Sequence, residues 1–227
     1  MSNLILFLSV VVGMLIVLLV KPKLKTSQIL LSFSGAYLLA IIMLELLPEV
    51  FQNGNAVNIG IFIIFGLIIQ IVLDFFSKGA DHGHVHLHLH NETYFPWVLL
   101  ISLSLHAFIE GLPLSHLHNH SLLIGIVVHN VPISIILGTA FVTSKIPKKN
   151  ALFFLIVFAM MSPLGNLTGG YLPFIQNYKT EITALVIGVL LHISTTIIFE
   201  SSKDHKFNMA KFISILIGFT LAILFAH

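Results

Sequence analysis

The sequence predicts an all-α integral membrane protein with eight transmembrane helices, and three observations support this prediction. Of the 227 residues, 57% are hydrophobic and only 9% are charged, whereas about a quarter of the residues in an average soluble domain are charged. The apolar residues form long stretches, each near the ~20 residues that a helix needs to cross a bilayer. The lysines gather in alternate loops between these stretches. We therefore expect a single transmembrane domain over residues 1–227.

Eight apolar stretches follow one another, joined mostly by short loops. They cover residues 4–20, 28–47, 57–76, 97–115, 121–142, 151–173, 182–200 and 211–226. Backbone polar groups in lipid must be satisfied internally, and stretches this long and continuously apolar favour helices over the alternating strands of a barrel. The first stretch has no charged region before it and no small-residue cleavage site after it, so we expect a retained helix and not a signal peptide.

The lysines predict how the bundle is oriented. Ten of the eleven follow the first, third, fifth and seventh stretches, and only Lys179, after the sixth, falls on the other side. Because Lys and Arg gather in cytoplasmic loops, both termini are predicted to lie outside. We expect a multi-pass protein of a cell membrane, and the compact size and short loops favour a bacterial inner membrane.

The predicted cytoplasmic loop of residues 79–94 is rich in histidine. In DHGHVHLHLHNE, histidines alternate with small or apolar residues, at His82, His84, His86, His88 and His90. Imidazole ligates several transition metals, so the tract predicts metal buffering or regulation, with a merely polar connector as the alternative. After the fourth stretch, outside, come His116, His118 and His120. For this second group, two interpretations are equally supported: an ordinary polar turn and a role in collecting metal ions.

Ionisable side chains inside membrane helices are costly and mark candidate functional positions. Those well within the stretches are Glu45, His106, Glu110, His129 and His192, and those nearer the ends are Asp74 and Glu200. The sequence contains no cysteine, so a metal site would use His, carboxylate, Asn, Met or backbone oxygen. Such donors favour zinc, iron(II), manganese or cobalt over copper(I).

Two motifs in neighbouring stretches carry most of this chemistry. In SLHAFIEGLPLS, His106 and Glu110 are four residues apart, which places them on one helix face as a metal half-site requires. Pro113 follows and is expected to kink the helix. In VVHNVPISIILG, His129 and Asn130 precede another proline. We expect the two helices to pack together and these four side chains to converge, the alternative being a buried structural hydrogen bond or ion pair.

These motifs resemble those of the ZIP (Zrt/Irt-like) family of divalent metal transporters. A histidine with an acidic residue four positions on, followed by glycine, is similar to the family's fourth helix, and the polar pair before Val131 and a proline is similar to its fifth. The second stretch ends in LLPE, at Leu46 to Glu49, and the sixth contains SPLGNLTGG. With eight helices, outside termini and a histidine-rich third loop, the resemblance covers essentially the whole chain.

The resemblance implies a transporter and not an enzyme, without a cofactor or a nucleic-acid partner. It implies a lipid bilayer around the protein and a divalent metal ion as substrate, zinc foremost, with Fe2+, Mn2+, Co2+ and Cd2+ as alternatives. It also implies movement into the cytoplasm. Small residues such as Gly165 and Gly169 predict close helix packing, within the chain or in a homodimer.

The sequence departs from the family pattern at three places. The family's fifth-helix motif usually ends in an acidic residue that can bridge two metals, and Ile133 stands there. Glu45 replaces the usual histidine of the second helix, and in the seventh helix only His192 and Glu200 are candidate donors. We therefore predict a single-metal or weakened two-metal site.

A route for the ion follows from these positions. Glu49 and the outer histidines would collect ions, the site around His106 would bind them, and the loop tract would receive them, with Glu45 and His192 as relay candidates. No nucleotide-binding loop is present, so ion or proton gradients or the membrane potential would supply the energy. The alternatives are an intramembrane zinc hydrolase, although HExxH is absent, and a metal-sensing or purely structural membrane protein.

Overall fold

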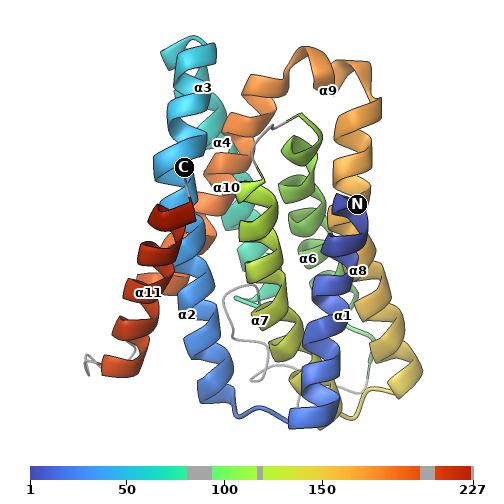
Figure 1. The fold of residues 1–227 in the computed structure, drawn as a ribbon. Helices are drawn as coiled ribbons and strands as arrows, with labels where there is room; N and C mark the ends of the chain where they lie inside the picture. The colour runs from blue at the N-terminus through green and yellow to red at the C-terminus, as the bar shows by residue number, and fades with distance from the viewer. Residues whose placement is uncertain (81–93, 117–119, 200–207, 226–227) are drawn as a thin grey trace.

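The structure is a computed structural model that describes residues 1–80, 94–116, 120–199 and 208–225. Throughout this part of the chain the regular elements are helices (Figure 1), so the predicted all-α fold class is confirmed. In chain order they are α1 (Ser2–Val20), α2 (Leu24–Ile41), the π-helix η1 (Ile42–Leu46), α3 (Leu47–Asn53), α4 (Ala56–Ser77), α6 (Trp97–Gly111), the 3-10 helix η2 (Leu112–Ser115), α7 (Ser121–Thr143), α8 (Lys148–Tyr171), α9 (Pro173–Asn177), α10 (Lys179–Phe199) and α11 (Met209–Phe225).

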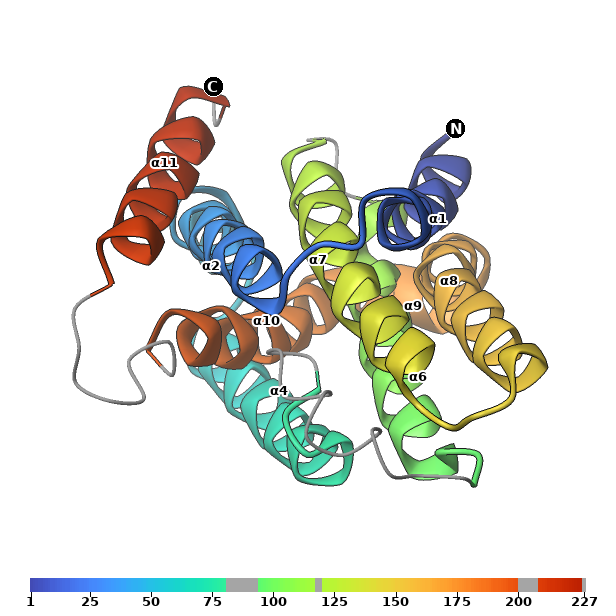
Figure 2. The ribbon, with the colours of Figure 1, turned by 90° about the horizontal axis from the view of Figure 1, so that it is seen from below.

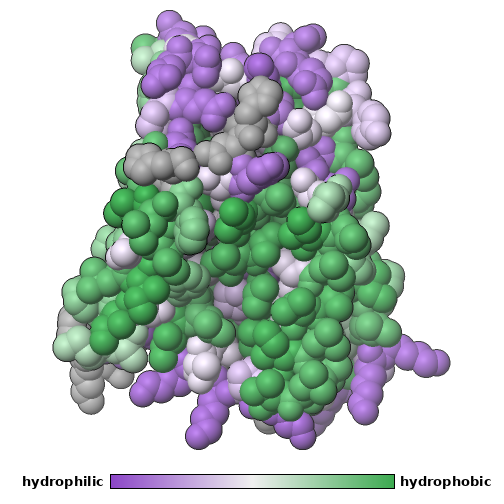
Figure 3. Space-filling model, viewed as in Figure 1, coloured by the Kyte–Doolittle hydropathy of each residue, from purple (hydrophilic) through white to green (hydrophobic). Residues whose placement is uncertain are grey.

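Seven of the described helical segments are long and apolar enough to cross a membrane. They are α1, Lys25–Asn53 (α2 to α3), α4, Trp97–Ser115 (α6 with η2), α7, α8 and α10. The shorter apolar helix α11 has 17 residues, which rise about 25 Å and fall slightly short of a ~30 Å hydrocarbon core. Figure 3 shows a broad hydrophobic band between polar ends, as a multi-pass membrane protein requires.

The second predicted stretch is longer in the structure than the hydropathy indicated. It was expected to end at residue 47, but the helix continues through η1 into α3 and ends at Asn53. Pro48 causes no break because it stands in the first turn of α3, where a missing backbone N–H costs little. The π-helical turn places Glu45 at an irregular point of the span, the kind of position often found at functional sites.

The helices form pairs, each of an inner helix and an outer helix (Figure 2). The inner helices contain a predicted site residue or, as α2 does, lead directly into an element that contains one. α7 packs against α1, α2 against α11, α6 against α8, and α10 against α4. Each contact contains a glycine on which a Cβ atom would meet a backbone carbonyl oxygen of the facing helix: Gly13, Gly218, Gly165 and Gly66, respectively. We call these contacts the glycine seams. Gly165 faces α6 and Gly169 faces η2, so the close packing predicted for them is found within the chain.

The two ends of the bundle differ in their connections (Figure 1). The α1–α2 and α7–α8 connections, in which Lys21 and Lys145 lie, are at the lower end, whereas α3, α9 and the start of α10 at Lys179 are at the upper end. This arrangement agrees with the segregation of lysines used above. Which end faces the cytoplasm stays a prediction.

Candidate metal centre

His106 and Glu110 lie on successive turns of α6 and face each other inside the bundle. The His106 Nε2 atom is 3.4 Å from Glu110 Oε2, and their side chains are 3% and 1% exposed. Two ligand atoms bound at about 2.0–2.1 Å to one tetrahedral zinc lie roughly 3.3 Å apart. The pair therefore already has the separation that a shared ion would impose.

Ser162 of α8 holds the other side of the Glu110 carboxylate. Its Oγ donates a hydrogen bond of 3.2 Å to Glu110 Oε1, and the serine is buried. The seam between α6 and α8 makes this contact possible, because Gly111 and Gly165 leave the two backbones close together. With Oε1 engaged, Oε2 is the oxygen directed toward His106.

His129 of α7 stands opposite His106. The two imidazole centroids are 6.4 Å apart with the rings nearly perpendicular at 84°, and His129 is completely buried. Ser34 of α2 lies behind it, with Oγ 3.4 Å from His129 Nδ1. Asn130, next in the chain, is also buried. Pro132 follows within α7 and has no N–H to donate to the Val128 carbonyl oxygen.

Four buried nitrogen and oxygen atoms that could bind a metal have no hydrogen-bond partner among the residues that the structure describes. They are His106 Nδ1, His106 Nε2, Glu110 Oε2 and His129 Nε2. A buried polar atom without a partner costs about 1–3 kcal/mol. Imidazole nitrogen and carboxylate oxygen are suitable ligands for zinc, iron(II) and manganese. The donor set thus fits a divalent cation.

The candidate ligands on α6 and α7 lie too far apart to share one ion in this structure. Within the described ranges, no three His, Asp or Glu side chains are grouped closely enough to hold one ion. Two imidazoles on one tetrahedral zinc would have centroids about 5 Å apart, compared with 6.4 Å between His106 and His129. Shared ligation would require the two imidazole rings to approach by about 1 Å.

The prediction that the helices of His106 and His129 pack against each other is wrong. α6 packs mainly against α8 and α4, and α7 mainly against α1 and α2. The physical reason is that the glycines allow α6 its closest contact with α8. Side chains of the two helices still meet, because the rings of His106 and His129 face each other and apolar residues of both helices belong to one buried cluster.

The remaining predicted site residues lie elsewhere. Glu45 in η1 and His192 in α10 are half-buried, and Glu49 in α3 is exposed. Glu200 and the tract at His82, His84, His86, His88 and His90 lie outside the described residues.

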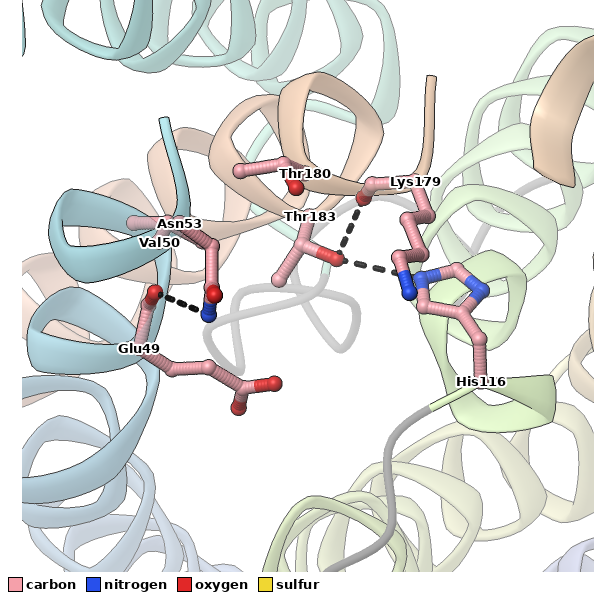
Figure 4. Close-up of a pocket in the computed structure, with 7 residues that line it drawn as sticks. All are labelled: Glu49, Val50, Asn53, His116, Lys179, Thr180 and Thr183. Carbon is pink, nitrogen blue, oxygen red and sulfur yellow. Dashed lines mark hydrogen bonds between the residues drawn. The ribbon is translucent and has the colours of Figure 1, made fainter. Parts of the chain in front are cut away.

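Glu49 lines a cavity of about 350 Å³ at the upper end of the bundle (Figure 4). Its walls come from α3, α10 and the residue after η2: Glu49, Val50, Asn53, His116, Lys179, Thr180 and Thr183. Thr183 Oγ1 donates to the Lys179 carbonyl at 2.8 Å and lies 3.2 Å from His116 Nε2. Burial, and then the nearby Lys179 charge, lower the pKa of His116. This cavity combines one carboxylate with one ammonium group and is distinct from the group around His106.

Sequence reasoning missed Ser34 and Ser162. Serines occur throughout the apolar stretches, and most of their hydroxyls bond to the carbonyl three or four residues earlier, as Ser32 does. Nothing in the sequence separates the two serines that contact the candidate ligands from the others.

Fold and site together define a class: a multi-pass α-helical membrane protein with histidine and carboxylate donors buried within the bundle. Residues 77–226 match the family described as ZIP Zinc transporter. The chain belongs to this family, which confirms the resemblance inferred from the motifs. It is also 28% identical over 170 residues to Protein zntD of Dictyostelium discoideum, covering 63% of this chain and 24% of that protein. The chain thus spans about a quarter of the length of this relative.

Proposed function

We propose that the protein carries a divalent transition metal, zinc foremost, across a membrane into the cytoplasm. Membership of the ZIP family supports this proposal. The observation that carries it to particular residues is the set of buried donor atoms on His106, Glu110 and His129 that have no hydrogen bond within the described structure. Asn130, buried beside His129, completes the proposed ligands. The metal preference, the direction and the bacterial inner membrane are parts of the proposal.

The donor types suit a carrier. Transport needs binding strong enough to replace the ion's water yet weak enough to release it. His and carboxylate ligands without thiolate provide intermediate affinity for several divalent metals. The need for the rings of His106 and His129 to approach also fits a site that tightens on an ion and then opens. We include Glu45 and His192 as relay candidates and Glu200 as a further candidate donor of the seventh span. Glu49 would act at the outer cavity, and the His82 to His90 tract at the receiving side.

A single ion for each transport site is the stoichiometry we propose. Ile133 lies one turn after His129 on α7, is 2% exposed, and belongs to a buried apolar cluster that also contains Leu103 and Ala107 of α6. No carboxylate is therefore available at the position where a second ion would be bridged. Anomalous scattering from two tightly bound ions at this depth would contradict this stoichiometry.

Uptake into proteoliposomes containing only this protein tests the function. We expect zinc to accumulate inside vesicles, and competition by iron(II), manganese, cobalt and cadmium to rank the metals. The double variant His106→Ala with Glu110→Ala should abolish uptake. Leu103→Ala, which also shortens a buried side chain of α6, is the matched control and should retain it. Uptake that survives the double variant would reject the site, and no uptake by the unaltered chain would reject the function.

A further inference from the structure

The hydroxyl of Ser34 contacts both the Leu31 carbonyl oxygen and His129 Nδ1, and these two contacts bear on which nitrogen of His129 carries the proton. Ser34 Oγ is 2.9 Å from the Leu31 carbonyl oxygen and donates its one hydrogen there. The same oxygen lies 3.4 Å from His129 Nδ1. A hydroxyl has one hydrogen and two lone pairs, so a Ser34 hydroxyl that donates over the shorter contact, to Leu31, accepts from His129. In this arrangement Nδ1 is the N–H donor.

This assignment leaves the other nitrogen available to a metal. A neutral imidazole has one N–H and one lone pair, so His129 Nε2 carries the lone pair. Nε2 is the buried atom that has no partner in the described part of the chain. Metal-ligating histidines usually donate their second ring N–H to a neighbouring acceptor, which fixes the tautomer and the orientation of the ring.

Resting on the function proposed above, we propose that Ser34 and Ser162 are positioning residues that present His129 Nε2 and Glu110 Oε2 to the transported ion. Ser162 orients the Glu110 carboxylate, just as Ser34 orients the His129 imidazole. It donates to Glu110 Oε1 at 3.2 Å and leaves Oε2 beside His106 Nε2 at 3.4 Å. The two serines come from α2 and α8, so four helices fix the atoms of the site.

The chain contains a matched control for Ser34. Ser32 is on the same helix and is 2% exposed, compared with 0% for Ser34. Its Oγ bonds to the Gln28 carbonyl at 2.9 Å, within its own helix. Ser32→Ala therefore removes an equally buried hydroxyl that does not contact the site. For Ser162 the corresponding control is Ser194→Ala, because the Ser194 Oγ bonds at 2.8 Å to the Leu190 carbonyl of its own helix.

Zinc affinity of the purified full chain, measured by competition with a fluorescent chelator, tests the role of the hydroxyls. Loss of a group that orients a metal ligand typically costs 10–100-fold in affinity, so Ser34→Ala and Ser162→Ala should each weaken zinc binding by about that factor. Ser32→Ala and Ser194→Ala should bind zinc like the unaltered chain. Ser34→Thr keeps the hydroxyl and should restore most of the affinity. Equal affinity in Ser34→Ala and Ser32→Ala would overturn the role of Ser34.

The tautomer is read in the unaltered protein, and a variant serves only to assign the signals. In zinc-free protein with ¹⁵N-labelled histidine, the His129 signals, assigned by their loss in His129→Gln, should show Nδ1 protonated and Nε2 unprotonated. The opposite tautomer would overturn the inference. The predicted tautomer in a chain that takes up no zinc would instead reject the proposed function and leave the assignment of atoms intact.

Discussion

Replacing Ile133 by aspartate should create a second carboxylate site on α7. Ile133 lies four residues after His129, the same spacing that joins His106 to Glu110 on α6, so the new carboxylate would lie on the face of His129. Ile133 is 2% exposed. Shortening a buried isoleucine costs about 2–5 kcal/mol, and burying an uncompensated carboxylate adds to this cost. Without metal, the variant should therefore be less stable than the unaltered chain by at least about 3 kcal/mol.

Zinc should reverse most of this loss. A ligand that binds only the folded state at 100 times its Kd stabilises it by about 2.7 kcal/mol, and at 1,000 times by about 4.1 kcal/mol. The control is Ile135→Asp, because Ile135 is 0% exposed on the same helix, but two residues from Ile133 it points about 200° away. Thermal unfolding in detergent with and without zinc, together with metal content per chain, provides the readout. Equal recovery by zinc in both variants, or unchanged metal content in Ile133→Asp, would refute the reasoning.

Three further predictions concern packing, electrostatics and binding. Gly66→Val should destabilise the chain by about 1–3 kcal/mol through overpacking, because a Cβ there meets a backbone carbonyl of α10. Gly60→Val, where nothing lies within 4 Å of the added Cβ, should have the same unfolding temperature as the unaltered chain. Equal losses of stability in the two variants would contradict the tight packing at Gly66. Lys179→Gln should raise the pKa of His116, because it removes the positive charge that disfavours the imidazolium. An unchanged pKa in an NMR titration would show that the lysine has no influence on this histidine. Zinc at 100 times its Kd should stabilise the unaltered chain by about 2.7 kcal/mol against thermal unfolding, and chelation should remove this gain; a His129→Ala variant that keeps the full gain would exclude that histidine as a ligand.

The helices were predictable from the sequence because lipid leaves few alternatives. An apolar stretch near 20 residues must satisfy its own backbone, so composition and length alone place the spans. The end of the second span was not predictable in this way. The apolar stretch was expected to end at residue 47, but a proline in the first turn of a new helix is compatible with continuation through η1.

The facing of His106 and Glu110 was predictable from the sequence, but the serines that contact the candidate ligands were not. The four-residue spacing places His106 and Glu110 on one face, and an ionisable group inside a span is rare enough to stand out. Which helices pack together depends instead on where small side chains let backbones approach, and Gly165 directs α6 to α8 and not to α7. Ser34 and Ser162 are contributed by two other helices, so local patterns around the histidines contain no sign of them.

The glycine seams determine what can move when the centre tightens around an ion. A backbone held against the carbonyl oxygens of its neighbour cannot shift alone without losing that contact, and packed interiors tolerate sliding better than separation. An approach of α6 toward α7 would therefore take α8 along, and α7 would take α1. The units that move would then be pairs of helices, not single helices. A mutation on the outer face of α8 or α1 can consequently change how an ion is held on α6 and α7 without touching either helix.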